Sequence, residues 1–218
     1  MKKNHGRSIL RAVAALSVPV LLALCFTPAS YSQTIIDEWD AVKAPPRPEL
    51  KPIAVDPKTT ALLLLDFNKQ TCNAERRPRC ITSIPKVKRL LAQARARGSF
   101  VVFSLSPGAT PADIAKELSP DKAEPIVTSG PDKFLGTDLE KVLKENKIAT
   151  VIVAATAAHG AVLYTASGAA LRGMRVIVPV DGISAETLYP EQYTLWHLTN
   201  APRVSGQVTL TETGLITY

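Results

Sequence analysis

The strongest structural signal in the chain is the stretch at residues 148–181, which reads IATVIVAATAAHGAVLYTASGAALRGMRVIVPVD. Residues 149–155 are small or β-branched and apolar, which is typical of a buried strand. A turn of small residues follows at 156–160. Residues 161–172 then have the composition of a helix, and Gly173 stands where such a helix ends.

A second apolar strand, predicted at residues 174–180, follows the helix and ends before Asp181. Two parallel strands joined by a crossover helix make a βαβ unit. Open α/β sheets bind ligands at the carboxyl ends of their strands, and a helix N-terminus directs N–H groups and the positive end of its dipole to that place. The residues that we expect to bind a ligand there are Ala157, Ala158, His159, Gly160 and Ala161.

The rest of the chain alternates strands and helices in the same way. Continuous apolar runs predict strands at residues 60–65, 99–105, 125–127 and 207–211. Helical spacing or composition predicts helices at residues 84–97, 111–118, 137–145 and 188–199. This alternation predicts an α/β fold, a three-layer αβα domain around a doubly wound, mostly parallel sheet.

Residues 1–32 have the features of a secretory signal peptide. Its positive charges are Lys2, Lys3, Arg7 and Arg11. The apolar stretch at 12–26 is short for a membrane span, and the small residues that follow place cleavage after Ser32. A lipid anchor at Cys25 is the alternative. We therefore expect export to the bacterial periplasm or beyond, with no membrane attachment once the signal is removed.

The composition fits one globular domain with a substantial core. The chain has 218 residues, of which 46% are hydrophobic and 21% charged. Removing the four positive charges of the signal from the formal net charge of +7 leaves +3. A net positive charge this small does not indicate a nucleic-acid partner. The local cluster of Arg76, Arg77 and Arg79 is interpreted as a solvated loop, with an anion site as the alternative.

Residues 33–58 are rich in proline and polar residues, so we predict an extended arm there. The globular domain is expected at residues 59–218. The arm would lie against this domain or against a partner subunit, and a homo-oligomer is the expected assembly.

The chain without its signal keeps two cysteines, Cys72 and Cys80. A pair eight residues apart in an exported protein predicts a disulfide that closes a small loop. A reactive Cys72 close to Asp66 in sequence is the alternative.

Asp66 follows four consecutive leucines, at the end of a predicted buried strand. A carboxylate in such a place either forms a cap or turn, or acts as an acid/base whose pKa is raised by apolar surroundings. Ser104, Ser106 and Asp181 end other strands of the same sheet, so they are expected at the same edge.

Three blocks of sequence carry a family resemblance. They are LLLLDFNKQ at 62–70, DKFLGTDLEKVL at 132–143 and VIVAATAAHGAVLYTASGAALRGMRVIVPVDGISA at 151–185. In order and spacing they resemble the isochorismatase-like hydrolases, also called the cysteine hydrolase superfamily. The resemblance implies a catalytic triad of Asp, Lys and Cys. Asp66 matches the Asp, Lys133 lies near the place of the Lys, and Ala161 falls on the position of the Cys. The alternative for Lys133 is an exposed lysine ahead of the helix predicted at 137–145.

An alanine cannot act as a nucleophile, so the resemblance with Ala161 in that place excludes the thioester mechanism. Some members that cleave a vinyl ether also lack the Cys, and a protonated Asp can carry out that proton transfer. We therefore expect a hydrolase of a small carbonyl or carboxylate compound with Asp66 as acid/base and Lys133 as its charge partner. The alternative is an inactive pseudo-hydrolase that binds a small ligand or takes part in an interaction.

Few histidines are available for chemistry. The chain contains only His5, His159 and His197, so neither a metal site nor any other cofactor is expected. His159 lies two positions before Ala161, at the predicted helix N-terminus, where one role open to it is to donate a hydrogen bond to a bound carbonyl or anion. A capping or subunit-contact role is the alternative for His159.

Overall fold

The computed structural model describes residues 34–218, so the predicted signal peptide lies outside the described residues. The described chain divides into two compact units that meet between Ala44 and Pro45. Residues 34–44, called the arm segment below, form turns and the short 3-10 helix η1 (Trp39–Ala41). Residues 45–218, called the domain below, contain all the other helices and strands described here.

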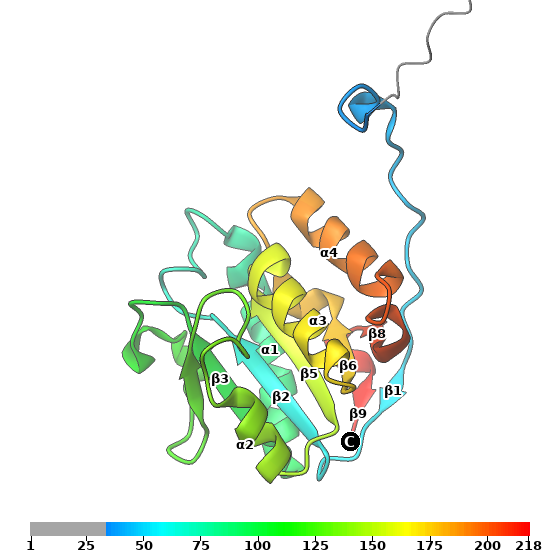
Figure 1. Ribbon diagram of the computed structural model, residues 1–218. Helices are drawn as coiled ribbons and strands as arrows, with labels where there is room; N and C mark the ends of the chain where they lie inside the picture. Colours follow the sequence, from blue (N-terminus) through cyan, green and yellow to red (C-terminus); the bar gives the residue numbers. More distant parts are fainter. Residues whose placement is uncertain (1–33) are drawn as a thin grey trace, which may run out of the picture. The chain divides into compact units, whose positions relative to one another are not determined.

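The domain is built on a parallel sheet with the strand order β4-β3-β2-β5-β6-β8 (Figure 1). The strands are β4 (Ile126–Thr128), β3 (Phe100–Leu105), β2 (Thr60–Leu65), β5 (Thr150–Thr156), β6 (Arg175–Pro179) and β8 (Val208–Thr211). A two-residue strand, β7 (Ile183–Ser184), pairs with the end of β5. Every pair in this sheet is parallel, so the carboxyl ends of the strands meet at one edge, as the sequence predicted.

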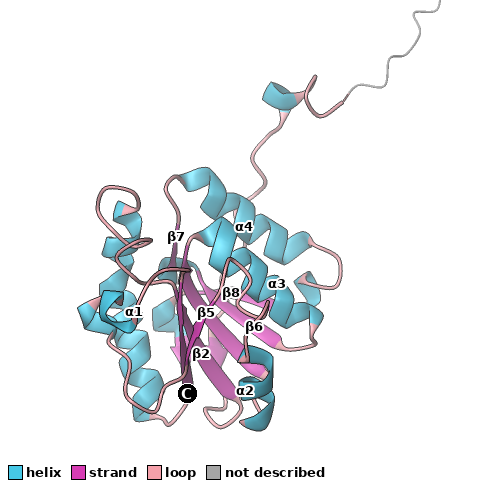
Figure 2. Ribbon diagram, turned by 60° about the vertical axis from the view of Figure 1, so that its left-hand side comes forward, coloured by secondary structure: helices cyan, strands magenta, loops and turns pink. Residues whose placement is uncertain are grey.

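Helices cover both faces of the sheet, which confirms the predicted three-layer αβα fold (Figure 2). The α-helices are α1 (Pro78–Ala96), α2 (Leu139–Glu145), α3 (Leu163–Leu171) and α4 (Leu188–Asn200). The single-turn helices of the domain are η2 (Pro111–Asp113), η3 (Lys116–Leu118), η4 (Ala158–Val162), η5 (Val180–Gly182), η6 (Ser205–Gln207) and η7 (Thr213–Leu215). Within residues 34–218, no helix is both long and apolar enough to cross a membrane.

The leucine run in β2 is continuous because both faces of the sheet are covered. Leu63 and Leu65 belong to the apolar cluster that contains residues of α2, α3 and α4, whereas Leu62 and Leu64 belong to the cluster that contains residues of α1. Alternate side chains of a strand point to opposite faces, so two of the four leucines pack into each core. This central position of β2 places the residue that follows it, Asp66, at the middle of the sheet edge.

Several predicted boundaries differ from those in the structure. The helix predicted at 84–97 begins earlier, at Pro78, because proline is favoured at the first helical position. The predicted helix at 111–118 is two separate 3-10 turns, η2 and η3. The helix predicted from residue 161 begins as the π-type turn η4, and α3 follows only from Leu163.

The compact domain begins at Pro45, before the residue 59 that the sequence suggested. Part of the predicted arm is a strand: β1 (Ile53–Ala54) pairs in parallel with β9 (Ile216–Thr217) near the end of the chain. The Lys51 N–H also donates to the Leu210 carbonyl, 3.0 Å away. The partners of this segment lie more than 150 residues away in sequence, so local composition could not reveal them.

A substitution at Ile216 of β9 tests how much the packing of this strand contributes to the stability of the domain. Ile216 is 3% exposed and belongs to the α1-side core, whereas its neighbour Leu215 is 37% exposed. We predict that Ile216→Ala lowers the free energy of unfolding by about 2–5 kcal/mol, since it leaves a cavity in packed core. Leu215→Ala should change it by less than about 0.5 kcal/mol. Urea denaturation of both variants measures the difference, and equal losses would contradict the packing of β9.

Candidate functional site

Asp66 terminates β2 and is held at the sheet edge by the neighbouring strand. Its backbone has a positive φ of 58°, in the left-handed region that Asp and Asn tolerate better than most residues. The side chain is buried, and its Oδ1 accepts a hydrogen bond from Ser104 Oγ at 2.8 Å. Ser104 is the residue of β3 that pairs with Leu65, so the register of the two strands fixes this contact.

Lys133 provides the charge that balances Asp66. Its Nζ lies 2.8 Å from Asp66 Oδ2, and its side chain is fully buried. The same Nζ donates to the carbonyl oxygens of Ser129 at 3.0 Å and Gly130 at 2.8 Å. The ammonium group therefore has three oxygen partners, as a buried cation requires. The structure brings together the two residues that the sequence proposed as a catalytic pair.

The environment of Asp66 shifts its proton affinity. Burial is the largest influence and raises the pKa of the Asp66 carboxyl above its ordinary value. The charge and hydrogen bond of Lys133 oppose this shift, as do the hydrogen bond from Ser104 and the charge of Arg77. The net effect is a raised pKa, which makes the protonated acid more accessible at mild pH than in an exposed aspartate.

The turn after β5 is built from small residues. Thr156 ends the strand, and its hydroxyl accepts a hydrogen bond from Ser184 Oγ of β7 at 2.9 Å. The peptide between Thr156 and Ala157 is cis. The amides of Gly160 and Val162 both donate to the Ala157 carbonyl, so these two N–H groups have partners within the turn.

The predicted binding residues of this turn differ in exposure. Ala157, Ala158 and Ala161 are buried, Gly160 is half-buried, and the His159 side chain is exposed. Ala161 belongs to the same apolar cluster as Leu65, which precedes Asp66, and Phe134, which follows Lys133. The residue at the position predicted for a nucleophile is thus a buried alanine of this apolar core.

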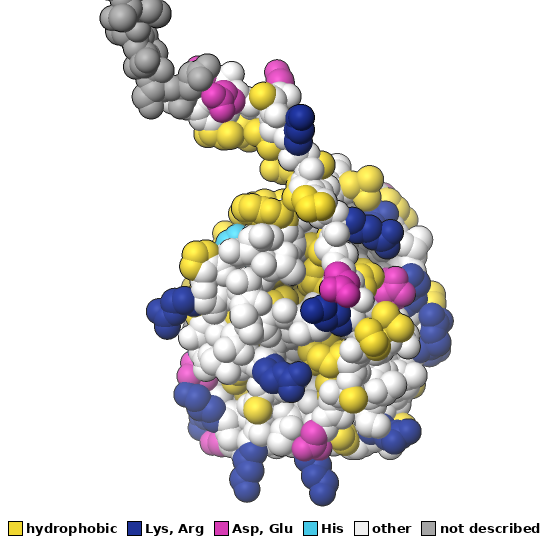
Figure 3. All heavy atoms as spheres, turned by 90° about the vertical axis from the view of Figure 1, so that its right-hand side faces the viewer, with side chains coloured by type: hydrophobic (Ala, Val, Ile, Leu, Met, Phe, Trp, Pro, Cys, Tyr) yellow, Lys and Arg dark blue, Asp and Glu magenta, His cyan; other side chains and the backbone are white. Residues whose placement is uncertain are grey.

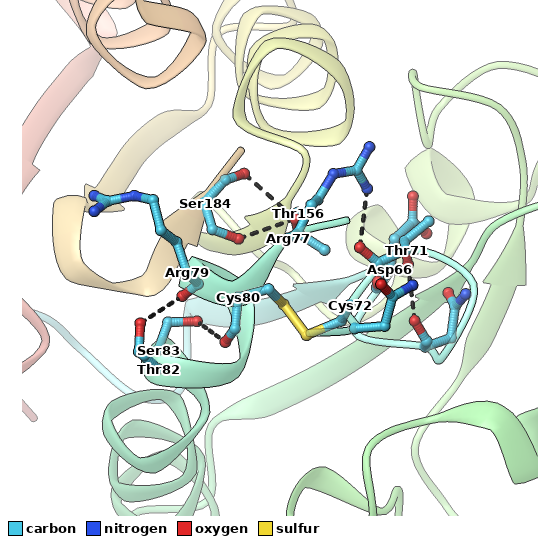
Figure 4. Close-up of a disulfide and its surroundings, with 12 residues drawn as sticks. Asp66, Thr71, Cys72, Arg77, Arg79, Cys80, Thr82, Ser83, Thr156 and Ser184 are labelled. Carbon is cyan, nitrogen blue, oxygen red and sulfur yellow. Dashed lines mark hydrogen bonds between the residues drawn. A yellow bond between two sulfur atoms is a disulfide. The ribbon is translucent and has the colours of Figure 1, made fainter. Parts of the chain in front are cut away.

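A disulfide fixes the loop that leaves Asp66 (Figure 4). Cys72 and Cys80 are bonded, as the sequence predicted, with 5.4 Å between their Cα atoms. Because its sulfur is in this bond, Cys72 is not the reactive thiol that was the alternative. The loop turns back on the site, since the Thr71 hydroxyl donates to the Asp66 carbonyl.

Arg77 was missed as a site residue, and the solvated-loop interpretation was wrong for it. Its side chain is only 7% exposed. It donates to the Thr71 carbonyl at 3.1 Å and to Glu186 Oε1 at 2.7 Å, and its buried Nε has no hydrogen-bond partner. Arg79 makes two hydrogen bonds to Glu191, at 2.7 and 2.6 Å. Both acids lie more than 100 residues away in sequence, so no local signal could identify these pairs.

Asp181, which was expected at the same edge, makes structural contacts instead. Its two oxygens accept from the N–H and the hydroxyl of Thr213, at 2.8 and 2.9 Å. Ser106 likewise accepts from the Asn68 side chain, at 3.1 Å. Among residues 34–218, no three His, Cys, Asp or Glu side chains are grouped so that they could hold a metal ion.

Comparison with known proteins identifies a matching family and solved structures with a similar fold. The model of a family described as isochorismatase domain matches residues 60–212. Three similar solved structures are a cysteine hydrolase from Pseudomonas syringae pv. phaseolicola 1448A, an isochorismatase-like hydrolase from Alkaliphilus metalliredigens and N-carbamoylsarcosine amidase from Thermoplasma acidophilum. Their identities to this chain are 18%, 25% and 22%, and their TM-scores are 0.66, 0.64 and 0.61. The matches cover 77%, 72% and 71% of this chain and 94%, 95% and 96% of those chains. No curated protein matches the chain.

The Arg77–Glu186 pair gives a pH-dependent contribution to stability. Burial alone would raise the pKa of Glu186, but the hydrogen bond from Arg77 and the nearby positive charges outweigh it and lower the pKa to about 2, from 4.5. A lowered pKa in the folded state stabilises the fold above pH 4.5, and this contribution is lost as the pH falls toward about 2. We predict that Glu186→Gln is less stable than the wild type at pH 6 and that the difference shrinks between pH 4.5 and 2.5. Chemical denaturation across this range measures it, with the exposed Glu117→Gln as control. A difference that is constant with pH would contradict the ion pair.

Proposed function

Since the chain belongs to the isochorismatase domain family, we propose that it is a hydrolase of a small carbonyl or carboxylate compound, with Asp66 as the acid/base. The observation that carries this proposal is the buried contact of 2.8 Å between Asp66 and Lys133. Burying two charges is costly, and replacing such a pair by apolar residues is often neutral or stabilising. A charged pair retained at the ligand-binding edge of an α/β sheet therefore supports a functional role.

The contacts of the pair define what each residue does in the proposed reaction. Asp66 gives a proton to the substrate or takes one from water, and its raised pKa favours this exchange. When the proton leaves, Lys133 Nζ and Ser104 Oγ stabilise the carboxylate from opposite oxygens. General acid–base catalysis of this kind contributes about 10²–10⁴-fold in rate.

The proposed reaction proceeds without a covalent thioester. By the resemblance, Ala161 stands at the position of the nucleophile, and a methyl group has no lone pair with which to attack. Water is therefore the attacking group in this proposal, and Asp66 is the residue that moves its proton. Cleavage of a vinyl ether fits this set of residues better than cleavage of an amide, because its difficult step is protonation of carbon.

A second candidate is an inactive pseudo-hydrolase that keeps the scaffold and binds a small ligand or another protein. The burial of the site favours it, because Asp66 is 6% exposed and Ala161 only 3%. The two candidates differ in turnover, which the variants below measure directly.

We also propose that the protein works outside the cytoplasm. The charged and apolar pattern of residues 1–32 supports a cleaved export signal. The disulfide between Cys72 and Cys80 supports an oxidising compartment such as the bacterial periplasm.

Asp66→Asn tests the acid/base role. Asparagine tolerates the left-handed backbone at this position, so the local conformation is kept. We predict a loss of at least about 10²-fold in hydrolysis of a panel of small vinyl ethers, esters and amides. Asp181→Asn is the matched control, since that carboxyl also ends a strand region but contacts Thr213, and it should retain activity. An active Asp66→Asn variant would refute the proposed acid/base, while a wild type that binds panel members without turnover supports the pseudo-hydrolase.

The stability of Asp66→Asn separates chemistry from folding. The substitution leaves the Lys133 ammonium buried without its charge partner, which should cost about 3–5 kcal/mol. The double variant Asp66→Asn/Lys133→Met removes both charges and should recover much of this loss while staying inactive. Calorimetry gives the stabilities, and recovery of activity in the double variant would show that the first loss was a folding effect.

Ala161→Cys tests whether the turn still activates a nucleophile. With Cys72 and Cys80 bonded to each other and the predicted signal removed, the introduced thiol is the sole free one. We predict alkylation by iodoacetamide at pH 7 at least tenfold faster than for the matched variant Ala158→Cys, which lies in the same turn and is buried like Ala161. Equal rates would mean that the activating environment has been lost.

A further inference from the structure

The arm segment carries apolar side chains that the structure leaves exposed. Ile35, Ile36, Trp39 and Val42 are between 59% and 71% exposed. The turn that bears them is held in shape, because the N–H and hydroxyl of Thr34 both donate to Asp37 Oδ2 at 2.8 Å. Four exposed apolar residues within eight positions form a patch of the kind that marks an interaction site.

The domain carries a groove that suits such a patch. A cavity of about 940 Å³ lies between α4, β8 and residues 45–51. Apolar side chains on its walls include Leu188, Leu195, Trp196, Val208 and Leu210. Figure 3 views the domain from the side of these elements and shows hydrophobic side chains on that surface, with charged side chains between them. Trp196 is 46% exposed and Leu188 66%, so part of this wall is uncovered within the described residues.

We propose that the arm segment of one copy of the protein occupies the groove of a second copy, so that two chains form a dimer by exchange of their arms. Trp39 is the anchor, and the groove wall formed by Leu195, Trp196 and Leu210 receives it. A reciprocal exchange seats two arms in two grooves, so each arm residue contributes twice.

The stiffness of residues 43–48 favours docking of the arm segment on a second copy of the protein over docking on its own chain. Only Lys43 and Ala44 separate Val42 from Pro45, and Pro46 and Pro48 follow. Each proline fixes its own φ and disfavours a helical turn in the residue before it. An extended stretch disfavours a turn of the arm segment over residues 45–51, which form one wall of the groove, and therefore disfavours its docking in its own chain.

Charge complementarity supports the same pairing. The arm segment contains Asp37, Glu38 and Asp40 but only one basic residue, Lys43. The domain at 45–218 has 21 basic residues against 16 acidic ones. In the groove, Glu191 is already neutralised by its two hydrogen bonds to Arg79, and Lys51 lies 3.8 Å from Glu49. Among the described residues that line the groove, Arg47 is therefore the cation left to face an acidic arm. An acidic arm is thus attracted to a basic domain.

The experiment measures association of the chain that begins at Gln33 by sedimentation equilibrium from 1 to 200 µM. We expect a reversible dimer whose dissociation constant rises at least 30-fold in Trp39→Ser. Two groove variants, Trp196→Asp and Gln192→Asp, should weaken it similarly, since both place a negative charge opposite the acidic arm. The matched control Tyr189→Ser changes an exposed aromatic of α4 outside the groove and should leave the dimer intact. Thermal melting confirms that each variant is folded.

Mixing variants tests the exchange itself. A Trp39→Ser copy retains an intact groove, and a Trp196→Asp copy retains an intact arm, so the mixture should form a heterodimer through one remaining contact although each variant alone is monomeric. The chain has two tryptophans, so in Trp196→Phe the emission of Trp39 reports on the arm alone and should shift to the blue with increasing protein concentration.

Several results would overturn the proposal. They are a wild type that stays monomeric at 200 µM, a dimer that survives Trp39→Ser, a mixture of the two variants that does not associate, and a Tyr189→Ser variant as impaired as Trp39→Ser. A Trp39 emission that is blue-shifted and independent of concentration would show that the arm docks on its own chain.

Discussion

The ion pair between Asp66 and Lys133 is the interaction around which the rest of the site is organised. Two charges in a low-dielectric interior are tolerated only when their remaining hydrogen-bonding capacity is satisfied. Here Ser104 donates to the second oxygen of the carboxylate, and two backbone carbonyls accept from the ammonium. These partners come from β3 and from residues 129–130, so satisfying the pair also fixes the ends of two strands relative to β2. A catalytic or ligand-binding role and a structural role therefore depend on the same contacts.

A second layer of contacts encloses that pair. The disulfide ties the loop after Asp66 to the first turn of α1, and the same turn carries Arg77 to Glu186 beyond β7. Arg77 adds positive charge near Asp66 and lowers the pKa of that carboxyl, against the larger effect of burial. The proton affinity of Asp66 thus depends on residues from several segments of the domain. A change at Arg77 would therefore alter the pKa of Asp66 through this electrostatic balance.

The fold could be predicted from the sequence to a large extent because its elements have strong local signals. The leucines at 62–65 alternate between two cores. A strand that is buried on both faces appears in the sequence as a continuous apolar run, which is easy to recognise. Boundaries were less accurate where the backbone departs from regular structure, as at η4, whose π-type turn delays α3 to Leu163. The strand β1 could not be predicted, because it depends on pairing with β9 at the opposite end of the chain.

The sequence by itself determined the strands β2, β3, β4, β5, β6 and β8, the disulfide pairing and the candidacy of Asp66, because each depends on neighbouring residues or on the two cysteines that follow the predicted signal. The family resemblance suggested Lys133 as the partner of Asp66, but only the tertiary structure showed the contact, since strand register and the path of residues 129–133 bring the Lys133 amine to it. It alone also showed that Arg77 is buried, because its partner Glu186 is 109 residues away. Burial and charge pairing depend on segments that are far apart in the sequence, so a local sequence pattern does not reveal them.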